Sequence, residues 1–177
     1  MGYLETHQPN AATEVRRAQS RRLLAPAELW PCLIVSPSEE RSEHFRQAVA
    51  EGGWDPLVRC GAEAAREALS RWRFRLAFVD LQGDGDRVPP GFRELAELLA
   101  NDRELLLVIC GTDGHPLEEI WAHQLGTWLY LPGASDEGGL VMLCSEARTV
   151  AERLYKKPLP TLVVGGRKNR GSLATDT

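Results

Sequence analysis

The sequence predicts an α/β fold built as a three-layer sandwich, in which helices cover both faces of a doubly wound, five-stranded parallel sheet. Two observations predict it. Between residues 30 and 156, short apolar runs alternate strictly with segments of helical period. The run ELLLVICG at 104–111 is almost wholly apolar, which is typical of a central strand buried on both faces of a parallel sheet.

Five apolar runs are expected to form the strands, because each is short and is bounded by turn-forming or polar residues. Pro56 predicts that the second strand lies at an edge of the sheet, where a missing backbone N–H is tolerated. The expected strands are 31–36, 54–60, 75–80, 104–111 and 127–133.

The segments between the strands are expected to be helices that each turn one apolar face toward the sheet. Ser36 is expected to cap the first helix, with Pro37 at its first position and Glu39 completing a capping box. The later helices are expected at 61–72, 92–102, 113–126 and about 138–155. The residues predicted to face inward include Phe45, Ala48, Val49, Ala65, Ala68, Leu69, Trp72, Phe92, Leu95, Leu98, Leu99, Leu117, Ile120, Trp121, Leu125, Leu140, Cys144, Ala147, Ala151 and Leu154.

The chain divides into one domain and two extensions. Residues 1–29 have no strong period and are expected to be partly helical or disordered. Residues 30–156 form the predicted domain. Residues 157–177 are interrupted by Pro and Gly and are expected to be a flexible basic tail, too short to form a further domain.

Composition and charge exclude several classes of function. At 43% hydrophobic and 26% charged residues, the chain has the composition of an ordinary globular protein. Residues 1–30 hold four Arg against three Glu, and residues 156–177 hold five Lys and Arg against one Asp, so an acidic body lies between basic ends. A nucleic-acid binder should instead have its basic face on the folded domain, so no nucleic-acid partner is expected.

No membrane, metal or disulfide is expected either. The sequence has no long apolar segment and no apolar leader region, which predicts a cytoplasmic protein without membrane contact. Its four cysteines have no CxxC spacing and each lies in an apolar stretch, so four buried, reduced thiols are expected. The histidines at 44, 115 and 123 lie on separate segments and have no partner at metal-ligand spacing.

Asp80 is the residue that suggests a function. It ends the apolar run RLAFVD, at the edge of the sheet where α/β proteins place their sites. Together with FVDLQG, the stretches LLLVICG and GTWLYLPGA make residues 31–155 resemble a response-regulator receiver domain, a flavodoxin-like (βα)5 fold that accepts phosphoryl groups in two-component signalling. The resemblance implies that Asp80 matches the phosphoacceptor aspartate and Tyr130 the aromatic switch residue.

Other positions depart from the family pattern. The resemblance places Ser36 and Pro37 where receivers have two acids that hold Mg²⁺, Cys110 where they have a hydroxyl, and Gly133 where they have a lysine. Proline and serine are poor ligands for a hard cation. Phosphoryl transfer depends on cations that neutralise the developing charge. We therefore expect that Asp80 is not efficiently phosphorylated, that no Mg²⁺ or other cofactor binds, and that the protein is not an enzyme.

Two further acids follow in the same loop. Asp84 and Asp86 are expected to lie in a solvated turn rather than to rebuild a cation site with Asp80, because they are separated by glycines.

The remaining expectation is that the protein acts by protein–protein interaction. In receivers, the fourth helix, fifth strand and fifth helix form the surface that dimerises or meets a partner, and here that surface includes Trp121, Trp128 and Tyr130. Trp128 and Tyr130, two residues apart, are expected to share one face of the strand.

Two alternatives stay open. One is a small ligand-binding protein or enzyme with a site at the strand ends, lined by Ser36, Asp80, Cys110 and Thr112. The other is a structural subunit of a larger assembly that is held through its tails. The tails would then be ordered only in the complex.

Overall fold

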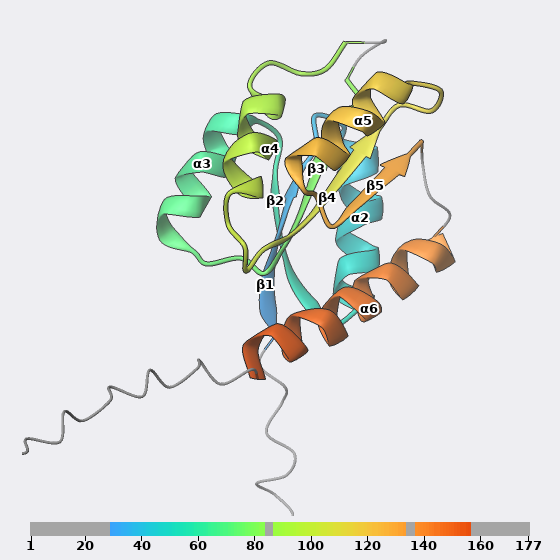
Figure 1. Ribbon diagram of the computed structural model, residues 1–177. Helices are drawn as coiled ribbons and strands as arrows, with labels where there is room; N and C mark the ends of the chain where they lie inside the picture. The colour runs from blue at the N-terminus through green and yellow to red at the C-terminus, as the bar shows by residue number, and fades with distance from the viewer. Residues whose placement is uncertain (1–28, 84–86, 134–136, 157–177) are drawn as a thin grey trace, which may run out of the picture.

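The computed structural model describes residues 29–83, 87–133 and 137–156, in which five strands alternate with five helices (Figure 1). The predicted N-terminal extension, apart from Leu29, and the predicted C-terminal tail lie outside the described residues. The strands are β1 (Trp30–Val35), β2 (Trp54–Arg59), β3 (Leu76–Asp80), β4 (Leu106–Gly111) and β5 (Leu129–Pro132). The helices are α2 (Glu39–Glu51), α3 (Ala62–Arg71), α4 (Phe92–Ala100), α5 (Pro116–Leu125) and α6 (Glu137–Lys156).

The strands form one parallel sheet in the order β2-β1-β3-β4-β5, which confirms the predicted doubly wound architecture. The strand with Pro56 is an edge strand, as predicted. The strand β4 lies inside the sheet with every residue buried, but the middle position belongs to β3. The register places Asp80 beside Cys110, so the ends of β3 and β4 lie at the same height.

Two hydrophobic clusters fill the space between the sheet and its helices. Side chains of β1 alternate between them: Leu33 and Val35 join the cluster under α3, α4 and α5, whereas Cys32 and Ile34 join the cluster under α2 and α6. Figure 1 shows the same layers, with α3 and α4 on the left of the strands and α2 and α6 on the right. The three-layer prediction is therefore confirmed.

The first helix begins later than predicted. Its N-cap is Ser38, not Ser36, and the Ser38 hydroxyl accepts a hydrogen bond from the Arg41 backbone N–H at 3.3 Å. The helix buries Phe45, Ala48 and Val49, as its apolar period predicts. The Ser36 hydroxyl instead donates to Asp80 on the neighbouring strand and accepts from the Ser38 backbone N–H at 3.2 Å.

Several apolar side chains predicted to face inward are exposed instead. Trp72, 57% exposed, follows the last residue of α3 in an extended conformation and so leaves the buried face of that helix. On α5, Glu118 and Ala122 face the core, which turns Leu117 (80% exposed) and Ile120 to the surface. The remaining exposed side chains of this set are Leu98 and Leu154.

The cysteines are all free thiols, but only three are buried. Cys32, Cys110 and Cys144 lie in the core, whereas Cys60 lies in the turn after the edge strand β2 and is exposed. The expectation of four buried thiols was therefore wrong at Cys60, because the last residues of an edge strand are covered on fewer sides. Within the described residues, none of the helices is both long and apolar enough to cross a membrane.

Candidate functional site

The carboxyl ends of β1, β3 and β4 bring three of the predicted site residues together. Ser36, Asp80 and Cys110 are each at most 1% exposed. The Ser36 hydroxyl donates a hydrogen bond of 2.6 Å to Oδ2 of Asp80. Asp80 is thus a buried carboxylate, and a buried carboxylate requires partners that compensate for lost water.

Arg41 provides the main compensation. Its Nε donates to Oδ2 of Asp80 and its Nη2 donates to Oδ1, each at 2.8 Å, so the two side chains form a bidentate ion pair. The Arg41 side chain is 21% exposed and that of Asp80 is fully buried. Arg41 lies in the first turn of α2, which starts directly above the end of β1, and this places its guanidinium over the end of β3.

Gln82 completes the cluster. Its backbone N–H donates to Oδ1 of Asp80 at 3.2 Å, while its side-chain oxygen accepts from Nη1 of Arg41. Its side-chain nitrogen donates to the Gly111 carbonyl at the end of β4. Ser36, Arg41, Asp80 and Gln82 are called the Arg41–Asp80 cluster below. Each Asp80 oxygen accepts two hydrogen bonds in it, and every nitrogen of the guanidinium donates.

Cys110 borders the cluster as a neutral group. Burial, and then the charge of Asp80, raise the pKa of its thiol well above the ordinary value. It therefore supplies neither a strong hydrogen-bond donor nor a thiolate at this position.

The other two positions implied by the resemblance add no charge. Pro37 stands between Ser36 and the N-cap of α2, and Gly133 follows β5 with a positive φ of 71°. The Gly133 backbone N–H donates to the Gly111 carbonyl at 2.9 Å. Asp84 and Asp86 lie outside the described residues. Among the residues that are described, no group of three or more His, Cys, Asp or Glu side chains is arranged to hold a metal ion.

A cavity of about 510 Å³ lies beside the cluster rather than inside it. The ligand site considered from the sequence was to be lined by Ser36, Asp80, Cys110 and Thr112. The first three are buried, and Thr112 is half-buried. The cavity is instead lined by Pro37, Ser38, Arg41, Gln82, Gly83, Arg87, Val88, Pro89 and Pro90.

Tyr130 belongs to a second buried polar group, next to the first. Its hydroxyl donates to Oε1 of Glu118 at 3.1 Å, and the Thr112 backbone N–H donates to the same oxygen at 3.1 Å. The other oxygen of Glu118 lies 3.5 Å from Nη2 of Arg93. Burial, followed by the charge of Glu118, raises the pKa of Tyr130 far above its ordinary value, so its hydroxyl stays protonated.

Gly111 makes the inward position of Tyr130 possible. A Cβ atom at this residue would overlap the Tyr130 hydroxyl and the Glu118 carboxylate. Gly111 therefore borders both the Arg41–Asp80 cluster and the Tyr130–Glu118 group. Its carbonyl accepts a hydrogen bond from Gln82, and its lack of a side chain leaves space for Tyr130.

The two tryptophans lie in different environments. Trp121 is half-buried on α5, and the guanidinium carbon of Arg93 lies 5.0 Å from its ring centre. Trp128 packs against the cluster under α2 and α6, whereas Tyr130 packs against the cluster on the other face. The prediction that they share one face was wrong, because β5 begins at Leu129 and Trp128 lies before its regular alternation.

Sequence reasoning missed Arg41, Gln82 and Glu118. For Arg41 a signal existed: the first turn of a helix favours acidic side chains, so an arginine there indicates a specific carboxylate partner. Glu118 lies among apolar residues in LEEIW, and nothing local marks it as the inward residue.

Comparisons with known proteins agree with this geometry at the level of the fold. No family model and no curated protein matches the sequence. Among solved structures, a CheY-like receiver domain protein from Methanospirillum hungatei superimposes with a TM-score of 0.61 at 16% identity, over 72% of this chain and 99% of that one. The receiver domain of a putative LuxO repressor protein from Vibrio parahaemolyticus gives a TM-score of 0.61 at 17% identity, over 72% and 98%.

The same fold also matches part of a longer protein. NtrX from Brucella abortus, solved in complex with ATP, gives a TM-score of 0.60 at 16% identity over 71% of this chain but only 28% of its own. These similarities, the strand order and the position of Asp80 at the end of β3 lead to one conclusion: the described part of this chain has the fold of response-regulator receiver domains.

Proposed function

We propose that the protein is a receiver-like regulatory module that acts by protein–protein interaction and is not switched by phosphorylation of Asp80. The observation that supports this most strongly is the bidentate ion pair between Arg41 and Asp80, closed by Ser36 and Gln82. It gives Asp80 a permanent cation from its own chain.

The charge balance of the cluster opposes a metal ion. The carboxylate of Asp80 is already neutralised by one guanidinium, so a divalent cation would meet a positive charge at the same position. Mg²⁺ requires oxygen ligands in a nearly octahedral arrangement, and carboxylates are the protein ligands that attract it most. Ser36 and Pro37 offer none. A resident Mg²⁺ is therefore not part of the proposed function.

The hydrogen bonds also oppose attack on a phosphodonor. A carboxylate oxygen must direct a lone pair at the phosphorus atom, but each Asp80 oxygen already accepts two hydrogen bonds. Asp80 is also fully buried. Reaction would require Arg41 to swing away, which would leave a buried carboxylate without its cation. We therefore assign no catalytic residue to this chain.

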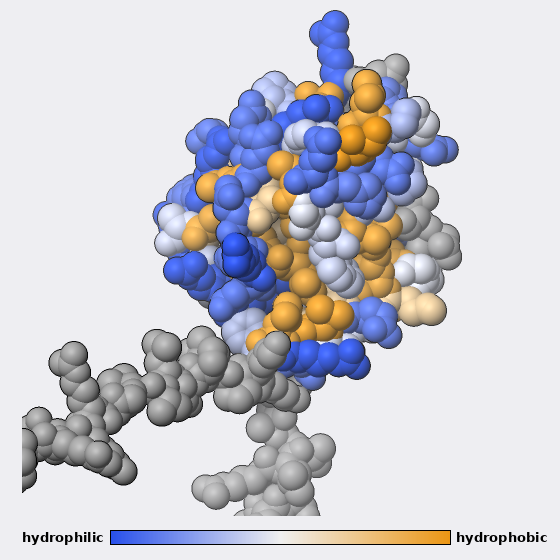
Figure 2. Space-filling view, viewed as in Figure 1, coloured by the Kyte–Doolittle hydropathy of each residue, from blue (hydrophilic) through white to orange (hydrophobic). Residues whose placement is uncertain are grey.

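The proposed surface for a protein partner lies on the side of β5. Figure 2 shows hydrophobic residues gathered over α5 and along the strip between α5 and α6. Exposed apolar side chains of these helices are Leu117 and Ile120 on α5 and Met142 on α6, and Trp121 on α5 is half-buried. Exposed apolar side chains that gather on a surface mark interaction sites in globular proteins. This surface is called the α5–β5–α6 face.

The test is exposure of the full chain to acetyl phosphate with Mg²⁺, followed by intact-mass measurement. Wild-type protein and Arg46→Met, a matched control on the exposed side of α2, are both expected to gain no phosphoryl group. A phosphoryl adduct on the wild type that disappears in Asp80→Asn would overturn the proposal. Comparison of peptide masses after digestion then shows whether any adduct lies elsewhere.

A further inference from the structure

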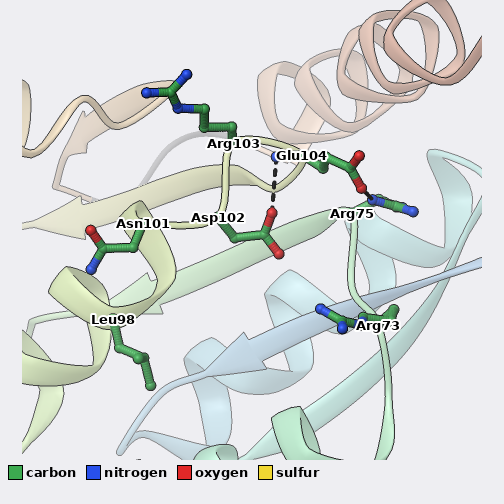
Figure 3. A pocket seen from close by; sticks show the side chains of 7 residues that line it. All are labelled: Arg73, Arg75, Leu98, Asn101, Asp102, Arg103 and Glu104. Atoms are coloured by element: carbon green, nitrogen blue, oxygen red, sulfur yellow. Dashed lines mark hydrogen bonds and ion pairs between the residues drawn. The ribbon is translucent and has the colours of Figure 1, made fainter. Parts of the chain in front are cut away.

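A groove with an apolar floor lies at the amino ends of β3 and β4, at the opposite end of the sheet from Asp80. It runs between the segment that joins α3 to β3 and the segment that joins α4 to β4 (Figure 3). Two cavities, of about 670 Å³ and 190 Å³, share Arg73, Leu98 and Asp102 in their walls. This surface is called the α3–α4 groove.

The apolar part of the groove has the character of a binding surface. Its floor includes Phe74, Leu99 and Leu105, which are buried, and its rim includes Trp72 and Leu98, which are exposed. An exposed tryptophan leaves a large apolar area in water, and covering that area with a partner is favourable. Tryptophan and arginine are the residue types that dominate binding energy at protein interfaces.

The charged part of the groove is open to an acidic group. Arg75 forms an ion pair with Glu104, and its guanidinium carbon lies 3.5 Å from the ring centre of Tyr155. Asp102 accepts a hydrogen bond from the Glu104 backbone N–H. Arg73 and Arg103 are exposed and, in the part of the chain that the structure describes, form no ion pair.

The matching surface is found on α5 of the same chain. Leu117 and Ile120, three residues apart, lie on one exposed side of the helix. The exposed acids Asp113 and Glu119 lie beside them. The first turns of α5 thus present apolar anchors flanked by carboxylates, which complement an apolar groove flanked by guanidinium groups.

These two surfaces cannot meet within one molecule. The helix α5 begins just after the carboxyl end of β4, and the groove lies before the amino ends of β3 and β4. Figure 1 shows the two places at opposite ends of the sheet. The chain's own C-terminal residues 157–177 are a poor occupant, because they hold four Lys and Arg against one Asp and would repel Arg73 and Arg103.

We propose that the α3–α4 groove binds α5 of a second copy of this chain, with Leu117 and Ile120 against the apolar floor and Asp113 and Glu119 toward Arg73 and Arg103. This inference rests on the proposed function, because it uses the exposed side of α5 as a docking surface. The contact joins two different surfaces, so each added copy leaves one groove and one α5 free. Such a head-to-tail contact builds open chains unless its rotation closes a ring.

The test is a mixing experiment on the full chain. One variant carries Arg73→Glu and Arg103→Glu, and the other carries Leu117→Glu and Ile120→Glu. Wild-type protein is expected to increase in mass with concentration in light scattering, and each variant alone is expected to be monomeric. An equimolar mixture is expected to form a dimer and nothing larger, because one intact groove and one intact α5 remain between the two variants.

Controls keep the result unambiguous. Arg46→Glu with Ala50→Glu, on the exposed side of α2, is expected to assemble like the wild type. Circular dichroism checks that each variant is folded. A wild type that stays monomeric at all concentrations, or two variants that stay monomeric when mixed, would overturn the inference. Neither result bears on Asp80, whose test is the separate mass measurement, so failure of the inference and failure of the proposed function are distinguishable.

Discussion

At the scale of single residues, the ion pair of Arg41 with Asp80 decides what the end of β3 can do. Asp80 lies where a reactive carboxylate is expected, but all of its hydrogen-bonding capacity is used inside the protein. A buried carboxylate with a bidentate partner behaves as a structural group, because removing either partner leaves an uncompensated polar atom in the core.

Removing the guanidinium measures this effect. Arg41→Met keeps the length of the side chain but leaves Asp80 buried without its cation, so the free energy of unfolding is expected to fall by roughly 3 kcal/mol. Urea denaturation measures it, with Arg46→Met on the same helix as the control. The double variant Arg41→Met with Asp80→Asn is expected to recover part of the loss, because a neutral amide needs no counterion. A loss no larger than that of Arg46→Met would contradict the assignment.

The buried thiols predict a pH dependence. Burial raises the pKa of Cys32 and Cys110, and raises the pKa of Cys144 to about 12. In the unfolded chain these thiols have a pKa of about 8.5, so above that pH only the unfolded state loses the proton easily. Stability is therefore expected to be complete below about pH 8.5 and to decrease as pH rises from there toward 12.

Urea denaturation at a series of pH values checks this dependence. Cys144→Ala is expected to make the decrease with rising pH shallower, whereas Cys60→Ala, at an exposed thiol, is expected to leave it unchanged. Equal slopes in the wild type and in Cys144→Ala would show that Cys144 is not one of the groups responsible.

Residue roles were the least predictable part of the site. Asp80, Ser36 and Cys110 could be placed together because strands that end at one edge of a parallel sheet bring their last residues together. The sequence places Arg41 in the first helical turn, but its partner depends on the direction of one long side chain, which the sequence does not determine.

At the scale of elements, α5 is the helix whose orientation the hydrophobic pattern did not predict. Its inward side is set by Glu118, which accepts from Tyr130 and from the Thr112 backbone, and apolar residues are displaced to the surface as a result. The inward sides of α2 and α4 agree better with the hydrophobic pattern, because each helix has a nearly continuous apolar side and no buried carboxylate. In α5, long-range hydrogen bonds therefore outweighed local periodicity.

Gly111→Ala tests how α5 and β5 are joined. The new methyl group would occupy the space of the Tyr130 hydroxyl and Glu118, so Tyr130 is expected to turn outward and the free energy of unfolding to fall by about 1–3 kcal/mol. Gly61→Ala is the matched control, because no atom lies within 4 Å of a Cβ built there and its φ is not positive.

Two measurements follow the effect of Gly111→Ala. Urea denaturation gives the change in stability, and intrinsic fluorescence of the five tryptophans, which include Trp121 beside Arg93, reports a change of their surroundings. If Gly111→Ala is as stable as Gly61→Ala and has the wild-type fluorescence, Tyr130 does not occupy the inward position in solution.

At the scale of the whole molecule, the sequence limited the topology to a few arrangements. Few strand orders are compatible with three observations: the strict alternation of strands and helices, the proline at position 56 and the rule of right-handed crossovers. The observed order β2-β1-β3-β4-β5 is one of them. The surface was less predictable, because the exposure of Trp72 and Leu117 depends on where each helix ends or turns relative to the sheet.

The Arg41–Asp80 ion pair also has a kinetic consequence. A metal ion or a phosphoryl group binds and leaves, and its residence time sets how long a site stays occupied. Arg41 is tied to Asp80 through the chain itself, so the pair has no dissociation constant and no hydrolysis rate. Its persistence is that of the native state, limited by local and global unfolding. The proposed function therefore implies that partners respond to the amount of this protein and not to a modification of Asp80.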